Sequence, residues 1–224
     1  MRMNKKEYYS EKEIVSSYHD TRYAGKSGSY VNNREINAVS KLLDKKGKVL
    51  DVACGQGRLD KIFGGFEVIG LDSSKEMLKY CKNKSNYQRV ILGDALNLPF
   101  DENTFDYIIT MRFFFHYPNI KPYLKEFKRI SKEGGFIIFQ TYRWSPRMIF
   151  NIKRLGGKVY IHSDKKVKHI LKELGLEIVK RECCFLFSPY IYKNLPYFVV
   201  KLLDLIEKII PPFLKVDVYW KVKK

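Results

Sequence analysis

The chain has 224 residues, enough for one domain with a full core, and its 42 basic and 24 acidic residues give a net charge of +18. No stretch approaches the roughly 18 apolar residues of a membrane span, and the amino terminus lacks the apolar core of a secretory signal, so we expect a cytoplasmic protein. The four cysteines show no Cys-x-x-Cys spacing, which predicts reduced thiols and no metal site.

The chain starts with a polar, aromatic segment. Tyrosines lie among charged residues over 1–35, and this segment includes a loop-like Ala-Gly-Lys-Ser-Gly-Ser stretch at 24–29. We therefore expect a helical cap over residues 1–35 with a flexible connection. Residues 36–224 form the main domain. We expect an amphipathic helix over 34–45 that leads into the first strand, because apolar residues recur there every three or four positions.

A strand followed by a glycine turn occupies residues 48–57. The apolar run around Leu50 suits a buried parallel strand, and Gly55 and Gly57 indicate a sharp turn with exposed backbone N–H groups. In open α/β sheets, ligands bind at the carboxyl ends of the strands. A dinucleotide fingerprint would need a third glycine where this chain has Asp60, which argues against a pyrophosphate ligand.

Two carboxylates end the first two predicted strands. Asp51 would repel a phosphate but can hold an ammonium group, and Asp72 follows the apolar run 68–71, where a carboxylate can accept both hydroxyls of a ribose. The pattern predicts a nucleoside ligand with a cationic tail.

Weaker signals place the next elements. Residues 58–64 predict a short helix whose amino end points at the ligand. Ser73 or Ser74 is the expected cap of a helix that ends near residue 83. Two further strands are expected over 90–92 and 105–111.

The second half of the chain continues the alternation. We expect a helix over 120–132 that Gly134 and Gly135 stop, and a helix that Ser163 and Asp164 cap and Gly175 ends. The other expected elements are strands over 136–141, 176–187 and 216–222, and a basic insertion over 144–160 on the substrate side.

Residues 195–214 carry a wide apolar face opposite Lys201, Asp204, Glu207 and Lys208. Packing of this amphipathic helix on the sheet explains the pattern. The alternative is peripheral contact with a membrane, or a lid over an apolar pocket.

The positive charge is concentrated late in the chain. Residues 141–224 hold 18 basic and 7 acidic residues, a net charge of +11. Such a surface can attract nucleic acid, anionic lipid or an acidic small molecule. The alternative is a solvated, lysine-rich surface without a partner.

Five blocks in order resemble the class I methyltransferases that use S-adenosylmethionine. They are Val-Leu-Asp-Val-Ala-Cys-Gly-Gln-Gly (49–57), Gly-Leu-Asp-Ser-Ser (70–74), Gly-Asp-Ala-Leu-Asn-Leu-Pro-Phe (93–100), Phe-Asp-Tyr-Ile-Ile (105–109) and Arg-Ile-Ser-Lys-Glu-Gly-Gly-Phe-Ile-Ile-Phe (129–139). The resemblance, to the small-molecule type of this family, implies an α/β, Rossmann-like fold. Its seven-stranded mixed sheet would have the order 3-2-1-4-5-7-6, with the last strand antiparallel and helices on both faces.

The resemblance also implies a cofactor site for S-adenosyl-L-methionine, with S-adenosyl-L-homocysteine as product. In the family's pattern Asp94 accepts from the adenine amino group and the Ala95 N–H serves a ring nitrogen. Ala53 stands where many members have glycine, and we expect only a slight change there. The full set of expected cofactor residues is Arg22, Asp51, Ala53, Gly55, Gly57, Asp72, Ser73, Asp94, Ala95 and Met111. For Arg22, which can pair with the cofactor's carboxylate, an ordinary surface arginine is the alternative.

The segment after the fourth strand bears on the acceptor. Family members that methylate base or amide nitrogens often carry Asp/Asn-Pro-Pro-Tyr/Phe here, whereas residues 112–118 read Arg-Phe-Phe-Phe-His-Tyr-Pro. His116 is a candidate general base and His19 its rival, with a packing or hydrogen-bonding role as the alternative. The expected substrate-side residues are Tyr18, Tyr23, Arg112 and Phe115.

Three hypotheses about function follow. The first is a methyltransferase acting on an oxygen or carbon of a small acceptor, lipophilic or anionic. The second is an RNA methyltransferase that uses the basic C-terminal third, with nucleic acid as a less favoured partner. The third is a non-catalytic protein that binds S-adenosylmethionine, which the complete set of cofactor blocks disfavours.

Overall fold

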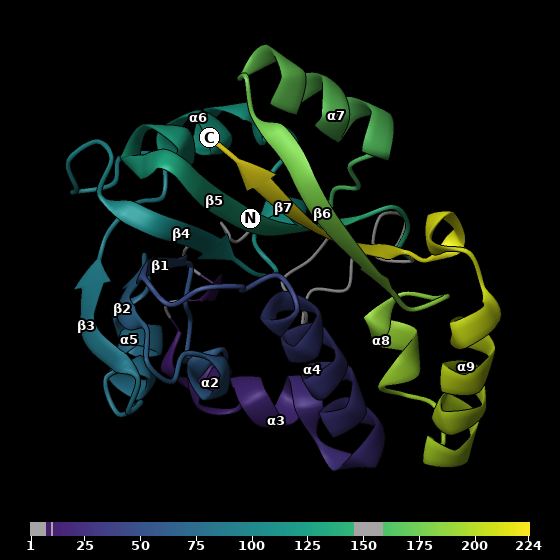
Figure 1. Cartoon of the computed structure of the whole chain (residues 1–224). Helices are drawn as coiled ribbons and strands as arrows, with labels where there is room; N and C mark the ends of the chain where they lie inside the picture. Colours follow the sequence, from purple (N-terminus) through teal and green to yellow (C-terminus); the bar gives the residue numbers. More distant parts are fainter. Residues whose placement is uncertain (1–7, 10, 146–158) are drawn as a thin grey trace.

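The computed structural model describes residues 8–9, 11–145 and 159–224, and it contains one seven-stranded sheet with helices on both faces (Figure 1). The strands are β1 Lys48–Val52, β2 Glu67–Asp72, β3 Tyr87–Leu92, β4 Phe105–Thr110, β5 Ser131–Tyr142, β6 Glu177–Cys184 and β7 Asp217–Lys223. Their order across the sheet is β3-β2-β1-β4-β5-β7-β6. The predicted fold class and strand order are therefore confirmed.

The pairing directions bring the carboxyl ends of several strands to one edge of the sheet. β1 pairs in parallel with both β2 and β4, so that Asp51 lies opposite Gly70 and Ile109. β7 is antiparallel to β5 and β6, with Phe139 opposite Trp220. Because β1 to β5 are parallel, their carboxyl ends meet at one edge, where ligands bind in such sheets.

Each face of the sheet is covered by its own hydrophobic cluster. On one face, α4 Gly25–Ser40 and α5 Lys75–Cys81 pack over a core that includes Val49 and Ile138. On the other, α6 Lys121–Ile130 and α7 Asp164–Glu173 pack over Leu50 and Trp220. Alternate residues of β1 thus serve opposite cores, as the period of a strand requires.

The helix caps that the sequence predicts are present. The Ser74 hydroxyl accepts from the Met77 N–H at the start of α5, and the Ser163 hydroxyl accepts from the Lys166 N–H at the start of α7. Each bond satisfies one N–H that lacks a partner in the first turn of a helix.

The first helices differ from the prediction. The stretch 24–29 is no loop, because α4 begins at Gly25 and crosses the expected boundary at residue 35. Gly28 is there for close packing: a Cβ at this position would lie 2.5 Å from the carbonyl carbon of Tyr23. Before α4, the chain forms two short helices, α2 Lys12–Ser16 and α3 Tyr18–Tyr23.

Two other local predictions are wrong. The expected helix 58–64 is a turn followed by the short 3₁₀ helix η1 Asp60–Ile62. Gly134 and Gly135 do not stop a helix, since α6 ends at Ile130 and both glycines lie inside β5. Gly135 leaves no room for a side chain there, because a Cβ would lie 2.8 Å from the Ser131 hydroxyl.

The chain ends with α8 Pro189–Tyr192, α9 Tyr197–Ile209, the 3₁₀ helix η5 Pro212–Leu214 and β7. α9 packs against α4 beside α8 at the edge of the molecule, and does not lay its apolar face on the sheet as predicted (Figure 1). Among the described residues, no helix combines the length and apolar character needed to cross a membrane. Most of the predicted insertion 144–160 falls outside the described residues.

Candidate functional site

The turn after β1 has three residues in the left-handed backbone region. Ala53, Gly55 and Gly57 have φ values of 58°, 56° and 73°. A Cβ at Gly55 would meet only the Met77 sulfur, at 4.0 Å, whereas a Cβ at Gly57 would lie 2.7 Å from the Lys84 side chain. Gly55 therefore leaves open space beside the backbone, while Gly57 allows close packing within the protein. Ala53 holds a conformation that costs a non-glycine residue about 1–2 kcal/mol.

Asp72 fastens the turn to the end of β2. One carboxylate oxygen accepts from the Gly55 N–H at 2.8 Å, and the other accepts from the Ser74 N–H at 2.9 Å. Burial raises the pKa of Asp72, although these backbone bonds oppose the shift. Each oxygen keeps a lone pair, so the carboxylate can still accept two hydroxyl groups of a ligand.

Asp51 lies deeper, at the end of β1. Its carboxylate is 2% exposed and accepts from the Tyr87 hydroxyl. Burial raises its pKa to about 7, and the nearby Asp72 adds to the shift while the Tyr87 bond opposes it. A buried carboxylate of this kind gains from a cationic ligand, because the cation compensates the loss of water.

Two neighbouring cavities meet at the turn. The larger, of about 620 Å³, is lined by Asp51, Gly55 and Arg58 and by His19 and Tyr23 of α3. The smaller, of about 110 Å³, is more apolar; its walls include Tyr9, Asp72, Ser73, Met77, Phe113, His116 and Tyr117. Both cavities share Tyr18, Ala53, Gly55, Met111 and Arg112, so they adjoin each other at the turn.

The first helices cover this site. The Gln56 side-chain amide donates to the Val15 carbonyl at 2.6 Å, and the Ser74 hydroxyl donates to the Tyr9 carbonyl at 2.6 Å. These bonds attach the N-terminal segment directly to the glycine turn and to the start of α5. The segment thereby shields the turn from water.

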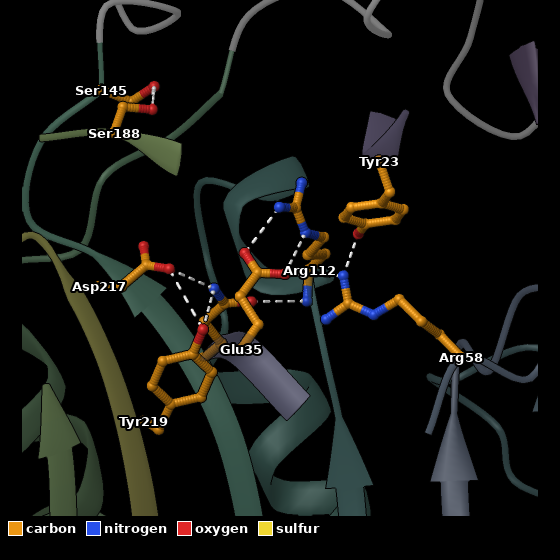
Figure 2. Close-up of polar contacts among 9 residues, drawn as sticks. Tyr23, Glu35, Arg58, Arg112, Ser145, Ser188, Asp217 and Tyr219 are labelled. Carbon is orange, nitrogen blue, oxygen red and sulfur yellow. Dashed lines mark hydrogen bonds and ion pairs between the residues drawn. The ribbon is translucent and has the colours of Figure 1, made fainter. Parts of the chain in front are cut away.

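A buried charged cluster joins the cover to the sheet (Figure 2). Glu35 of α4 is 0% exposed and accepts from Arg58 at 2.7 Å and from two nitrogens of Arg112 at 2.6 and 3.0 Å. Burial alone would raise the pKa of Glu35, but the two guanidinium groups lower it. Tyr23 hydrogen bonds with Arg58, and its ring lies 5.0 Å from that guanidinium carbon and 5.3 Å from that of Arg112.

Side chains of β5 and β7 extend the hydrogen bonds of this cluster. The Gln140 side-chain oxygen accepts from the Arg112 N–H at 3.0 Å, and its amide nitrogen donates to Asp217 at 2.8 Å. Tyr219 also donates to Asp217 (Figure 2), whose pKa burial raises well above the ordinary value. Arg112, with φ of 53°, is thus fixed through both its backbone and its side chain.

Two of the predicted residues lie away from the two cavities as the described residues form them. Arg22 is buried over the Tyr18 ring and lines a separate small cavity with Lys193. Phe115 stacks on Tyr142, with ring centroids 4.9 Å apart, and belongs to a core cluster with it. The aromatic wall of the site is formed by Phe113 and Tyr117 instead. Arg112 lines both cavities, but Glu35 already occupies its guanidinium group.

The remaining predicted residues lie in three places. Asp94 and Ala95 form the turn after β3, where Asp94 accepts from the Leu96 N–H at 3.0 Å, outside the lining of the two cavities as the described residues form them. His116 lines the smaller cavity, with Nε2 3.4 Å from the Tyr9 hydroxyl. His19 lines the larger cavity and is 61% exposed. The two candidate bases therefore serve different parts of the site.

Sequence reasoning missed Glu35, Arg58 and Gln140. Arg58 directly follows the second glycine of the turn, which is a usable signal for a residue at the site. Its Nη2 atom is buried without a hydrogen-bond partner among the described residues, so the guanidinium keeps capacity for an anionic group. Glu35 pairs with residues 23 and 77 positions away, and no local pattern announces such pairs.

The comparisons with known proteins point to one domain family. Residues 50–139 match the family model described as methyltransferase domain. An uncharacterized protein of Methanocaldococcus jannaschii is 33% identical over 179 residues, which cover 80% of this chain and 66% of that protein. The demethylmenaquinone methyltransferase of Staphylococcus carnosus is 44% identical over 104 residues, which cover 42% of this chain and 43% of that enzyme. The chain thus spans less than two thirds of the length of these curated relatives.

A solved structure extends the likeness over the whole chain. The crystal structure of magnesium protoporphyrin IX methyltransferase from Synechocystis PCC 6803 with bound SAH has a TM-score of 0.69 and is 14% identical. The match covers 99% of this chain and all of that one, 100%. At this identity the likeness shows a shared fold.

Proposed function

Because this chain belongs to the class I methyltransferases that use S-adenosylmethionine, we propose that it moves a methyl group from this cofactor to an oxygen or carbon of a small, largely apolar acceptor. The observation that carries the proposal is the pair of adjoining cavities at the carboxyl edge of the sheet, lined by Asp51, Asp72 and Gly55. Their polar groups suit a nucleoside with an amino-acid tail, and their aromatic groups suit a base and an apolar acceptor.

The residues present fit the cofactor in both cavities. In the smaller cavity, Asp72 would accept the ribose hydroxyls, and Met77 and Phe113 offer apolar walls for a base. In the larger cavity, Asp51 would hold the ammonium group and Arg58 the carboxylate of the methionine part. Once bound, S-adenosylmethionine supplies a methyl group activated by a sulfonium sulfur.

The acceptor would enter the larger cavity beside Tyr18 and Tyr23, since the smaller one serves the nucleoside. Glu35 and Arg112 hold Tyr23 and the end of β4 in fixed positions, which preserves the alignment of acceptor and methyl group. Alignment and water exclusion can together supply about 7–11 kcal/mol of a reaction barrier. His19, on the acceptor side, is the better placed candidate for removing a proton from the acceptor.

Two of the supporting relatives are named for a demethylmenaquinone and a sterol acceptor. They match over roughly two fifths of this chain. The rings of Tyr18 and Tyr23, which line the larger cavity, support an apolar acceptor. The basic C-terminal third supports a second candidate, methylation of RNA, since residues 141–224 carry a net charge of +11.

Cofactor binding and methyl transfer are tested separately. Calorimetry with S-adenosylhomocysteine should show binding to the wild type, loss of most affinity in Asp72→Asn, and no loss in Asp101→Asn, a matched charge change on an exposed loop. Labelled S-adenosylmethionine and cell extract should then place the label in the lipid or small-molecule fraction. Label in RNA would favour the second candidate, and binding without transfer to any fraction would contradict both.

The histidines are tested with the acceptor that this labelling identifies. His19→Ala should lower turnover by about 10²-fold or more if His19 acts as the base, while His116→Ala should mainly weaken cofactor binding. Unchanged turnover in both variants would show that alignment alone suffices.

A further inference from the structure

α9 exposes an apolar stripe on its outer side. The outer stripe consists of Phe198, Leu202, Leu205 and Ile209 of α9 and Phe213 and Leu214 of η5, which are 54% to 82% exposed. The four residues of α9 are spaced by four, three and four positions, so they lie along one side of the helix. A contiguous exposed apolar patch of this kind marks an interaction surface.

Polar contacts hold the helix in this orientation. Asp204 accepts from the Tyr30 hydroxyl at 2.5 Å, and Glu207 accepts from Arg34 at 2.7 Å. Glu207 also accepts from the Tyr192 hydroxyl and is 1% exposed. The inner side of α9 is therefore the side with carboxylates, and turning the outer stripe inward would break a set of buried polar contacts.

The same contacts leave the exposed charge of the helix positive. Both carboxylates of α9 are occupied by α4 and α8, whereas Lys201 and Lys208 are exposed beside the outer stripe. Lys215 follows directly after η5. An apolar stripe flanked by lysines matches the interface of an anionic bilayer, where acyl chains receive the apolar residues and lipid phosphates attract the lysines.

We propose that the outer stripe of α9 and η5 docks on the surface of a bilayer that contains anionic lipids. A second copy of the chain fits less well, because a symmetric contact through this face would bring the lysines of both copies together. RNA would attract the lysines but would leave the apolar side chains in water. The docking is independent of the cofactor site, and it would place the protein where apolar acceptors dissolve.

Vesicle co-sedimentation tests the contribution of the lysines to docking. The wild type should sediment with phosphatidylcholine vesicles that contain phosphatidylglycerol, and more weakly with pure phosphatidylcholine. The double variant K201E/K208E should lose about tenfold or more of its partitioning, since a lysine near the surface contributes about 1 kcal/mol. The matched control K168E/K172E changes exposed lysines of α7 and carries the same net charge. It should stay within about twofold, because charges beyond a Debye length from the bilayer are screened.

Single substitutions test the contribution of the apolar side chains to docking. Ile209→Ser should lower partitioning roughly tenfold, since it removes most of the transfer free energy of a large apolar side chain. Val179→Ser, a comparable change at an exposed residue of β6, should leave it unchanged. Far-UV circular dichroism and S-adenosylhomocysteine binding, both unchanged, would show that the variants keep the native fold.

Three results would overturn the proposal. The first is equal sedimentation with and without phosphatidylglycerol at low salt. The second is an equal loss in K201E/K208E and K168E/K172E, which would mean that total charge, and no particular face, binds the vesicles. The third is a wild type that light scattering finds dimeric and that Ile209→Ser makes monomeric without any vesicle binding, which would assign the stripe to a second copy.

Discussion

Two adjacent residues of α4 take part in two different buried clusters. Glu35 turns toward the turn after β1 and pairs with Arg58 and Arg112, while Arg34 turns toward α9 and pairs with Glu207. Both glutamates are buried, but the arginines around Glu35 are only 15% exposed, whereas Arg34 is 31% exposed. The enclosed cluster shapes the wall of a cavity, and the more open one fixes a helix whose apolar side faces outward. Similar ion pairs thus border a cavity in one place and orient an exposed helix in another.

The largest effect should come from removing one glutamate at a time. Glu35→Gln leaves two buried guanidinium groups without a counter-charge, and we expect it to lower the free energy of unfolding by about 3–5 kcal/mol. Glu207→Gln should cost about 1–3 kcal/mol, because water reaches Arg34 and the amide can still accept one hydrogen bond. Urea denaturation measures both without screening the charges. Equal losses would show that burial of the arginines does not distinguish the two clusters.

Substitutions of Gly55 and Gly57 test the glycine turn at the edge of the cavities. Gly57→Ala meets side chains and a left-handed backbone together, so we expect a loss of about 2–4 kcal/mol in stability. Gly55→Ala meets open space and should lose only about 1–2 kcal/mol, from strain. Its Cβ would point into the site, however, and S-adenosylhomocysteine affinity should fall further than the loss of stability explains. If Gly55→Ala bound as tightly as the wild type, the open space would not be the ligand site.

Asp51 makes the cavity sensitive to pH. An ammonium ligand needs the ionised carboxylate, whose pKa is raised to about 7, so affinity should fall roughly tenfold between pH 8 and pH 6. Tyr87→Phe removes a bond that lowers this pKa and should move the midpoint upward. Calorimetry across this range measures both, and a flat profile in the wild type would contradict the assignment of Asp51 to the ammonium group.

Stability responds to Asp51 in the opposite direction. Its pKa in the folded protein lies above that of an unfolded carboxyl, near about 4, so the folded state binds the proton more tightly. The stabilising contribution is present below pH of about 4 and is lost as the pH rises toward about 7. Comparing the pH dependence of unfolding in Asp51→Asn and wild type measures this contribution.

The smallest effects are expected on the outer side of α9. Ile209→Ser should change the free energy of unfolding by less than about 0.5 kcal/mol, because the side chain is already in water. Val200→Ala, on the inner side of the same helix and 0% exposed, should cost about 1–3 kcal/mol. Thermal or urea unfolding of the pair measures the difference. A large loss in Ile209→Ser would mean that the outer stripe is buried within the fold.

The sequence predicted the sheet well because its strands leave local signals. Apolar runs that end in Asp51 and Asp72, together with the glycine turn, are enough to place two neighbouring strands and the ligand edge between them. Ser74 and Ser163 announce their helices because capping needs a particular side chain at one position. These features depend on residues close together in the chain.

The features that failed depend on contacts between separate elements of the fold. Gly28 belongs to a helix because Tyr23 packs against its backbone, and composition alone suggests a loop. On the inner side of α9, Tyr30 and Arg34 meet two carboxylates beside the buried Val200, so part of the apolar stripe predicted from the sequence faces outward. The Glu35 cluster is assembled from separate elements of the chain, and only the folded structure brings it together.

The central claim is that the edge formed by Asp51, Gly55 and Asp72 holds S-adenosylmethionine. Isothermal titration of the purified protein with S-adenosylhomocysteine, beside the variants Asp51→Asn and Asp72→Asn, tests it most directly. We predict one site per chain in the wild type and a loss of roughly tenfold or more in affinity in each variant. A folded wild type that takes up no S-adenosylhomocysteine, or variants that bind it as tightly as the wild type, would contradict the claim.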